Sequence, residues 1–459
     1  MSASRKLFGT DGIRGRANVH PMTGEVMFEL GRAVALAFQL SPREGGERRV
    51  LIGKDTRRSG YMLEDALAAG LCSMGVHVLQ LGPMPTPALA FLTTDMRCDA
   101  GAMISASHNS FEDNGVKFFS RDGFKLPDEM ESRIESLMYS NELSAHRPIG
   151  AQIGRARRID DAAGRYIVFL KKTFPKELSL DGLRIAVDCA HGAAYKVAPT
   201  VLEELGAEVV AVAASPNGTN INDGCGALHP ESVAQVVSRY RADLGIALDG
   251  DADRAIFADE NGEIVDGDRV LAMSALELQR TGSLARATVV GTVMSNLGLE
   301  LALKRAGIQL LRTGVGDRYV VEAMLREKLN LGGEPSGHVV FLEHNTTGDG
   351  MLTALQVLAL MRRHERPLSS LASVIDPVPQ VLRSVRVREK PPFEQLEGVH
   401  ATLRRIEAEL QGLGRIHVRY SGTEPVARVM IEGEDPGRID ELAREMCEQI
   451  SSAIGEEAR

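Results

Sequence analysis

At 459 residues the chain is too long for a single hydrophobic core, so we expect about three or four domains. Its composition, 44% hydrophobic and 25% charged, is ordinary for a globular protein, and no apolar run reaches the ~20 residues of a membrane span. The net charge of −9 argues against a nucleic-acid-binding surface, and five scattered cysteines argue against a disulfide framework or a zinc site. The N-terminus carries no apolar export segment, so we expect a cytoplasmic protein with no nucleic-acid or membrane partner.

A pattern of helix, glycine and strand occurs three times along the chain. The copies span residues 63–82, 198–213 and 297–314, and each follows another apolar strand. Strand–helix–strand units of this kind build parallel sheets covered by helices. This pattern is common in α/β proteins, so three copies favour a repeated structural unit without proving that a domain was duplicated. We predict three similar α/β domains with mixed, largely parallel sheets.

The pattern changes after the proline-containing stretch at residues 376–380. Two apolar strands joined by the short loop SGTEP, with a long helix before them and another after them, predict an antiparallel α+β domain. Four domains result, which we place at residues 1–155, 156–258, 259–372 and 373–459.

Two loops in the first predicted domain carry candidate chemistry. FGTDGIRGR combines three glycines with Arg14, and a run of small residues ends at Ser107 and His108, with Lys117 beyond it. Small side chains let a hydroxyl stand exposed at a strand end, while His108 and Lys117 can donate a hydrogen bond or take a proton. A serine nucleophile and a simple turn both fit. No G-x-S-x-G elbow surrounds Ser107, so an α/β-hydrolase is disfavoured.

The second predicted domain ends with three acidic residues in alternation. Asp249, Asp251 and Asp253 directly follow an apolar strand. Carboxylates this close repel one another unless a cation neutralises them, and hard oxygen ligands suit Mg²⁺ or Ca²⁺. A calcium loop of the EF-hand type is disfavoured because Arg254 occupies the position that needs glycine. An aspartyl-phosphate phosphatase stays an alternative, with Asp249 as nucleophile and Asp251 as acid.

Two later loops carry polar groups suited to hydroxyl-bearing or phosphorylated ligands. GGEPSGH places Glu334, Ser336 and His338 at alternate positions, which fits either a ligand site or a structural loop. RYSGTEPVAR offers backbone N–H groups, hydroxyls and guanidinium groups to a phosphate. The candidate phosphate ligands are Arg419, Ser421, Gly422, Thr423 and Arg428. No Walker A motif is present, so the phosphoryl group would not come from a P-loop nucleotide.

Together and in this order, these loops resemble those of the α-D-phosphohexomutase family over essentially the whole chain. The resemblance implies four domains that each contribute one loop to a central cleft. It implies that Ser107 in SASHN is the phosphoserine, and that phosphorylated Ser107 and the three aspartates of DGDADR bind one Mg²⁺. It further implies that GEPSGH binds the sugar hydroxyls and that RYSGTEP holds the substrate phosphate.

Within the family, residues 9–18, 217–231 and 315–324 are most similar to members that act on glucosamine phosphates. The resemblance therefore implies an isomerase that interconverts glucosamine 6-phosphate and glucosamine 1-phosphate, feeding UDP-N-acetylglucosamine synthesis. Ser110, Ala252 and Pro335 depart from the family pattern. Because Pro335 lies in the sugar-binding loop, a phosphomannomutase or phosphoglucomutase preference stays open.

The implied mechanism needs cations around the transferring phosphoryl group. Arg14 and Arg254 would share its charge, and Lys117 would move the proton of the attacking hydroxyl, with His108 or His338 as substitutes. A bisphosphorylated sugar acts as intermediate and activator. The resemblance also implies a homodimer. A kinase or autophosphorylation would first phosphorylate Ser107, and the sequence does not decide between them. A non-catalytic sensor of sugar phosphates is disfavoured because the nucleophile and the metal ligands are all present.

Overall fold

The computed structural model describes residues 7–9, 11–39, 47–412, 414–421 and 425–455. The chain forms two compact units, Met1–Thr292 with Leu311–Val374 and Val293–Leu310 with Ile375–Arg459. All five cysteines are free thiols. In the described part of the chain, every helix is too short or too polar to cross a membrane.

The first sheet has six strands in the order β1-β5-β4-β2-β3-β6. Strand β2 (Arg49–Lys54) pairs in parallel with β3 (His77–Pro83) and with β4 (Ala100–Ile104), and β5 (Asp113–Ser120) turns back antiparallel to β4. The edge strands are β1 (Ile13–Arg16) and β6 (Ala156–Arg158). The helices are α1 (Gly24–Gln39), α2 (Ser59–Ser73), α3 (Thr86–Asp95), α4 (Asp128–Met138), α5 (Glu142–Ala145) and the 3₁₀ turn Gly150–Gln152.

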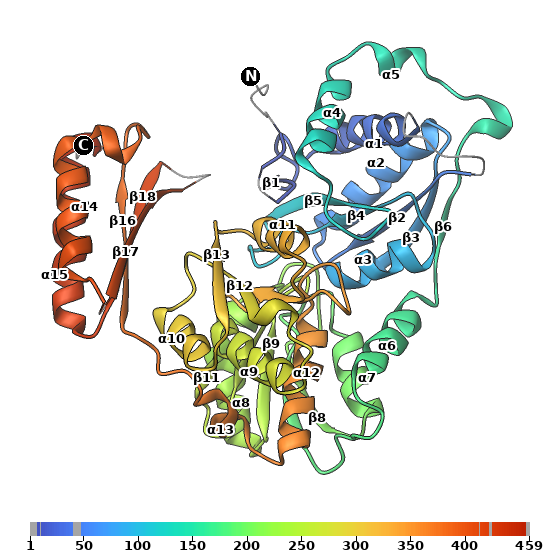
Figure 1. Cartoon of the computed structure of the whole chain (residues 1–459). Helices are drawn as coiled ribbons and strands as arrows, with labels where there is room; N and C mark the ends of the chain where they lie inside the picture. Colours follow the sequence, from blue (N-terminus) through green and yellow to red (C-terminus); the bar gives the residue numbers. More distant parts are fainter. Residues whose placement is uncertain (1–6, 10, 40–46, 413, 422–424, 456–459) are drawn as a thin grey trace. The chain divides into compact units, whose positions relative to one another are not determined.

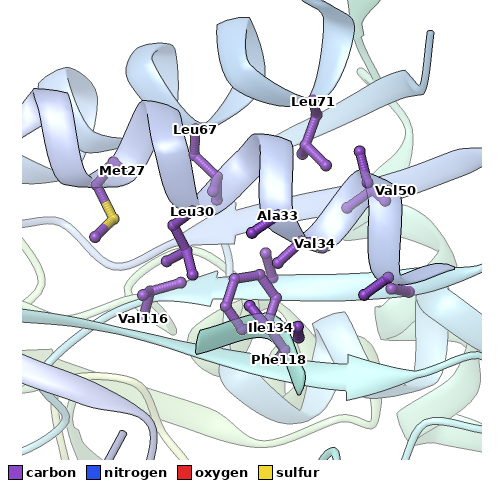
Figure 2. Close-up of a cluster of buried hydrophobic side chains, with 14 of the residues drawn as sticks. Met27, Leu30, Ala33, Val34, Val50, Leu67, Leu71, Val116, Phe118 and Ile134 are labelled. Carbon is purple, nitrogen blue, oxygen red and sulfur yellow. The ribbon is translucent and has the colours of Figure 1, made fainter. Parts of the chain in front are cut away.

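The first core lies between this sheet and the helices α1, α2 and α4 (Figure 1). Apolar side chains recur three or four positions apart on α1 and α2, so each helix turns one stripe toward the other elements. Figure 2 shows part of this cluster of buried side chains, among them Leu30, Ala33, Val34, Leu67, Leu71, Val116, Phe118 and Ile134. This packing fixes the sheet that carries Ser107, in the loop after β4, and Lys117, on β5.

The second sheet has the order β11-β10-β9-β7-β8. Strand β7 (Arg184–Asp188) is parallel to β8 (Glu208–Val212) and to β9 (Leu244–Leu248), and β10 (Ala255–Ala258) turns back antiparallel to β9, with β11 (Ile264–Val265) at the edge. Its helices are α6 (Ala162–Thr173), α7 (Val197–Glu204), α8 (Pro230–Tyr240) and the 3₁₀ turn Gly226–Leu228.

The third sheet has the order β13-β12-β14-β15. Strand β12 (Thr288–Thr292) lies beside β13 (Gln309–Thr313) and parallel to β14 (Leu331–Gly333), which pairs antiparallel with β15 (Val339–Phe341). The helices along this part of the chain are α9 (Gly267–Arg280), the 3₁₀ turn Ala285–Ala287, α10 (Leu297–Arg305), α11 (Asp317–Glu327), α12 (Gly350–His364) and α13 (Leu368–Ala372). Of these, α10 belongs to the second unit.

The predicted helix–glycine–strand repeat is confirmed in all three sheets. After α2, α7 and α10 the chain passes through a glycine at positive φ, 84° at Gly75, 103° at Gly206 and 73° at Gly307, before the next strand begins. Such a glycine ends a helix without a Cβ penalty. The strands β4, β9 and β14 each turn back as a hairpin, which places the Ser107, aspartate and Glu334 loops at equivalent positions of the three sheets.

The second unit contains the predicted antiparallel α+β domain. Strands β16 (Gln380–Arg386), β18 (Val426–Gly433) and β17 (Gly414–Tyr420) form the sheet in that order, and both pairings are antiparallel. Helices α14 (Glu397–Glu409) and α15 (Pro436–Ile454) pack on it, after the 3₁₀ turn Phe393–Gln395. The fold class is thus confirmed, whereas the residue boundaries of the four domains and their arrangement around a central cleft stay predictions.

Candidate active site

The Ser107 hydroxyl meets the Asp249 carboxylate, although 142 positions separate the two residues along the chain. Ser107 Oγ donates a hydrogen bond of 2.7 Å to Asp249 Oδ2, and His108 Nδ1 lies 3.3 Å from the same hydroxyl. Ser107 is only 1% exposed, so the prediction of an exposed hydroxyl is wrong. We call the segment between β4 and β5, residues 105–112, the serine loop. The loop after β9 lies directly on the serine loop and covers it.

The three aspartates of the second sheet form a buried cluster. One carboxylate oxygen from each of Asp249, Asp251 and Asp253 lies within 4.8 Å of the other two. Among the residues that the structure describes, Asp251 Oδ1 and Asp253 Oδ1 are buried without a hydrogen-bond partner. Buried carboxylate oxygens without partners are costly, and hard oxygen ligands are the donors that a divalent cation prefers. The cluster fits a metal ion.

The pKa values of the cluster diverge. Burial, together with the charges of Asp253 and Asp251, raises the pKa of Asp249 well above its ordinary value. Burial also opposes the charged form of Asp253, yet Lys117 and His338 hold its pKa well below the usual range. Neighbouring buried carboxylates repel one another, so they do not all carry a negative charge unless a cation neutralises them.

Lys117 lies inside the same cluster. Its Nζ donates to Asp251 Oδ2 at 2.8 Å and lies 3.5 Å from Asp253 Oδ2. Burial opposes its charge, but Asp251, Asp11 and Asp253 together raise the pKa of Lys117 above its ordinary value. The structure therefore brings a buried ammonium group into contact with two of the three aspartates.

Two arginines add positive charge around the serine loop. The backbone N–H of Arg254 donates to Asp249 Oδ1 at 3.2 Å, and its Nε lies 3.7 Å from Asp253 Oδ1. Arg14, on β1, pairs with Asp11. Burial and the charges of Arg254 and Arg14 lower the pKa of His108 to about 4, so this imidazole is neutral at pH 7. The predicted cations Arg14 and Arg254 thus both place positive charge near His108, the neighbour of Ser107.

The loop between β14 and β15 joins the cluster through His338. Its Nδ1 lies 3.6 Å from Asp253 Oδ1, and its Nε2 accepts a hydrogen bond of 3.1 Å from the Gly348 N–H. Glu334 Oε1 accepts from the Gly316 N–H at 3.0 Å, and the Ser336 hydroxyl lies 3.4 Å from Glu334 Oε2. Polar groups from all three sheets therefore surround one place.

The predicted phosphate loop lies in the second unit. Arg419 on β17 and Arg428 on β18 are direct cross-strand neighbours. Burial and the charge of Arg428 lower the pKa of Arg419. Like charges opposite each other in a sheet are destabilising, so this pair suits an anion between them. Ser421 is buried at the end of β17, whereas Gly422 and Thr423 lie outside the described residues.

Several polar residues of the site have no motif in the sequence. The Thr86 hydroxyl donates to Asp251 Oδ2 at 2.5 Å, and Lys125 pairs with both Asp11 and Asp317, whose Oδ2 lies 3.6 Å from His338 Nε2. Asn222 and Arg57 contact the serine loop. For two of them the sequence did give a signal, which was their position along the chain. Asp317 lies in residues 315–324 and Asn222 in residues 217–231, two stretches that set this chain apart within the resembled family.

Models of four protein domains match the chain in order. Phosphoglucomutase/phosphomannomutase alpha/beta/alpha domain I matches residues 5–145, domain II 164–262, domain III 266–378, and the C-terminal domain 382–449. Each candidate loop falls inside one of these matches. Ser107 lies in domain I, the aspartates in domain II, Glu334 in domain III and Arg419 in the C-terminal domain.

Relatives resemble the chain over nearly its whole length. A phosphoglucosamine mutase from Citrifermentans bemidjiense is 58% identical over 456 residues, 99% of this chain and 100% of that protein. The solved structure of a phosphoglucomutase/phosphomannomutase family protein from Burkholderia thailandensis has a TM-score of 0.79 at 23% identity and covers 97% of both chains. That of N-acetylphosphoglucosamine mutase from Aspergillus fumigatus, in complex with GlcNAc-6P and magnesium, has a TM-score of 0.68 at 19% identity, covering 98% of this chain and 96% of that one. This chain belongs to the phosphoglucomutase/phosphomannomutase family.

Proposed function

We propose that this protein interconverts glucosamine 6-phosphate and glucosamine 1-phosphate. Phosphorylated Ser107 gives its phosphoryl group to one sugar phosphate, and the resulting bisphosphate returns its other phosphoryl group to Ser107. The observation that carries the proposal is the 2.7 Å hydrogen bond from Ser107 Oγ to Asp249 inside a buried cluster of three aspartates. The relative that is 58% identical over its whole length supports an amino sugar as substrate.

Mg²⁺ is the cation that we assign to the aspartate cluster. Asp249, Asp251 and Asp253 would hold it together with an oxygen of phosphorylated Ser107, a set of hard oxygen donors that suits this ion. The two buried carboxylate oxygens without partners in the described structure support this assignment. When bound, Mg²⁺ supplies positive charge that polarises the phosphoryl group and stabilises the charge that develops during transfer.

The surrounding side chains have separate roles in this proposal. Arg14 and Arg254 stabilise the negative charge of the transferring phosphoryl group, as fixed cations do in a site that excludes water. Lys117 moves the proton of the sugar hydroxyl, with His108 and His338 as alternatives. Asp249 holds the Ser107 hydroxyl in place and accepts its hydrogen bond.

Substrate binding is assigned to the remaining loops. Glu334 and Ser336 take the sugar hydroxyls, since a carboxylate and a hydroxyl offer an acceptor and a donor on one turn. In the second unit, the phosphate of the sugar binds the loop of Arg419, Ser421, Gly422, Thr423 and Arg428. This loop must accept either phosphate, because the bisphosphate presents both in turn. Three expectations stay predictions: a homodimer, a cytoplasmic location, and a first phosphorylation of Ser107 by a kinase or by autophosphorylation.

A coupled assay tests the proposal. With Mg²⁺ and a hexose bisphosphate as primer, we expect turnover of glucosamine 6-phosphate far above that of glucose 6-phosphate or mannose 6-phosphate. Ser107→Ala should reduce this turnover by about 10³-fold or more while the circular dichroism spectrum stays unchanged. A strong preference for mannose or glucose would assign the alternative phosphomannomutase or phosphoglucomutase activity. Full activity of Ser107→Ala would refute the mechanism.

A further inference from the structure

Two side chains hold the backbone of the serine loop from two different domains. Arg57, between β2 and α2, donates from Nη2 to the carbonyl oxygens of Ser107 and Asn109, at 2.9 and 2.8 Å. Asn222, between β8 and the turn Gly226–Leu228, donates from Nδ2 to the same two oxygens, at 2.9 and 3.0 Å. Each carbonyl oxygen therefore receives two donors, which matches its two lone pairs.

The donors are themselves fixed. Arg57 is fully buried, and its Nε donates to Asp55 Oδ2 at 2.8 Å. The Ser105 hydroxyl donates to the same Asp55 oxygen at 2.6 Å and accepts from the Ser107 N–H at 2.9 Å. The backbone N–H of Asn222 donates to the Ala190 carbonyl at 2.9 Å. Both peptide groups of Ser107 are thus held by groups that cannot easily move.

This arrangement maintains an unfavourable backbone conformation at the nucleophile. Ser107 has a φ of 51°, in the left-handed region that is sterically unfavourable for an L-residue. Such a conformation persists only where the surrounding contacts enforce it. Here it decides where the Ser107 hydroxyl points, because the side chain leaves from the same Cα.

We propose that Asn222 is a positioning residue that sets the Ser107 oxygen in line for phosphoryl transfer. The inference rests on the proposed function. Asn222 belongs to the same sheet domain as the three aspartates, so its two bonds tie the serine loop of the first sheet to the aspartate cluster of the second. Transfer requires the reacting atoms about 3–3.5 Å apart, and a misplacement of about 1 Å can cost ~10²-fold in rate.

Three variants test this role in the full-length protein. Asn222→Ala should lower kcat for glucosamine 6-phosphate by about 10–100-fold and change KM by less than about two-fold, since Asn222 does not belong to the proposed sugar or phosphate loops. Asn222→Asp is nearly isosteric, but it turns a carboxylate oxygen toward the two carbonyl oxygens, so its kcat should fall further. Asn217→Ala is the matched control, because the Asn217 side chain is exposed and, among the described residues, accepts hydrogen bonds only from Thr219 of its own loop.

A second readout separates this inference from the choice of substrate. Intact-protein mass spectrometry gives the rate at which glucose 1,6-bisphosphate phosphorylates each variant, and we expect Asn222→Ala to be slower than Asn217→Ala by the same factor as in turnover. If the natural protein is phosphorylated but does not convert glucosamine 6-phosphate, the proposed substrate fails and the positioning role is still measured. Equal rates for Asn222→Ala and Asn217→Ala would overturn the role, as would a loss of activity in both Asn222 variants that merely follows a loss of thermal stability.

Discussion

At the scale of single residues, the site depends on the close approach of two backbones. Gly250 lies between Asp249 and Asp251, and a Cβ at this position would lie 2.6 Å from the Ser107 carbonyl oxygen and 2.8 Å from Asn222 Nδ2. Atoms in a packed interior do not tolerate such distances. Glycine at position 250 therefore lets the serine loop lie on the aspartate loop.

Gly250→Ala should consequently separate the two loops. We expect turnover to fall by at least about 10²-fold and the free energy of unfolding to fall by about 1–3 kcal/mol. Steady-state kinetics and thermal unfolding measure the two effects. The control is Gly164→Ala, at an exposed position on α6 where a Cβ meets nothing within 4 Å. This variant should keep full turnover and gain up to about 1 kcal/mol. Equal turnover in the two variants would show that the close approach is irrelevant.

Residue chemistry could be predicted where a motif concentrates it, as in the three alternating aspartates and the small-residue run that ends at Ser107. The supporting residues could not. Thr86 and Asp251 lie 165 positions apart, and Asn222 and Ser107 lie 115 apart. Arg57 and Asn222 moreover bond to backbone carbonyl oxygens, which every residue has and which therefore leave no pattern in the sequence. For the same reason the burial of Ser107 was missed, because the covering loop comes from another domain.

At the scale of elements, the repeated strand–helix–strand units were predictable from apolar periodicity and from the glycine after each helix. The order of the strands was not, because pairing depends on residues far apart in the chain. Strand β4 lies beside β2 rather than beside β3, and β9 lies beside β7 in the same way. This order is what places the serine, aspartate and Glu334 loops at equivalent hairpins.

An ion cluster joins two helices of the third α/β sheet domain. Glu277 on α9 contacts Arg280 of its own helix at 2.8 Å, and it contacts Arg363 at 2.7 Å and His364 at 3.0 Å in the last turn of α12. Its hydrogen bonds, first those with Arg280, lower the pKa of Glu277 from 4.5 to about 2. Because the folded-state pKa is depressed, the charged carboxylate stabilises the fold above pH 4.5, and this contribution is lost as the pH falls toward about 2.

Glu277→Gln should therefore lower stability in a pH-dependent way. At pH 7 we expect a loss of about 1–3 kcal/mol, since the neutral amide cannot replace the charged bonds to two arginines. The difference from the natural protein should shrink as the pH falls below about 4.5, because Glu277 of the unfolded chain then binds a proton while the folded protein keeps the carboxylate charged. Urea unfolding of both proteins over this range measures the difference. A loss that stays constant down to about pH 3 would contradict the assigned pKa direction.

At the scale of the whole molecule, the functional groups are divided between two units. The first unit contains Ser107 and the aspartate cluster, and the second contains the arginine pair of β17 and β18. The net charge of −9 gives no hint of anion binding. The cations that suit a phosphate are local instead, and the order of the loops along the chain, rather than the composition, indicated the family.

The central claim is that Ser107 carries the phosphoryl group beside the aspartate cluster. The most direct measurement is to incubate the protein with Mg²⁺ and glucose 1,6-bisphosphate, quench it in acid, and map the modified peptide by mass spectrometry. We predict a single phosphate on Ser107 that is stable in acid and absent from Ser107→Ala. A phosphate on Asp249 that is released by mild base would contradict this account and would establish the aspartyl-phosphate alternative.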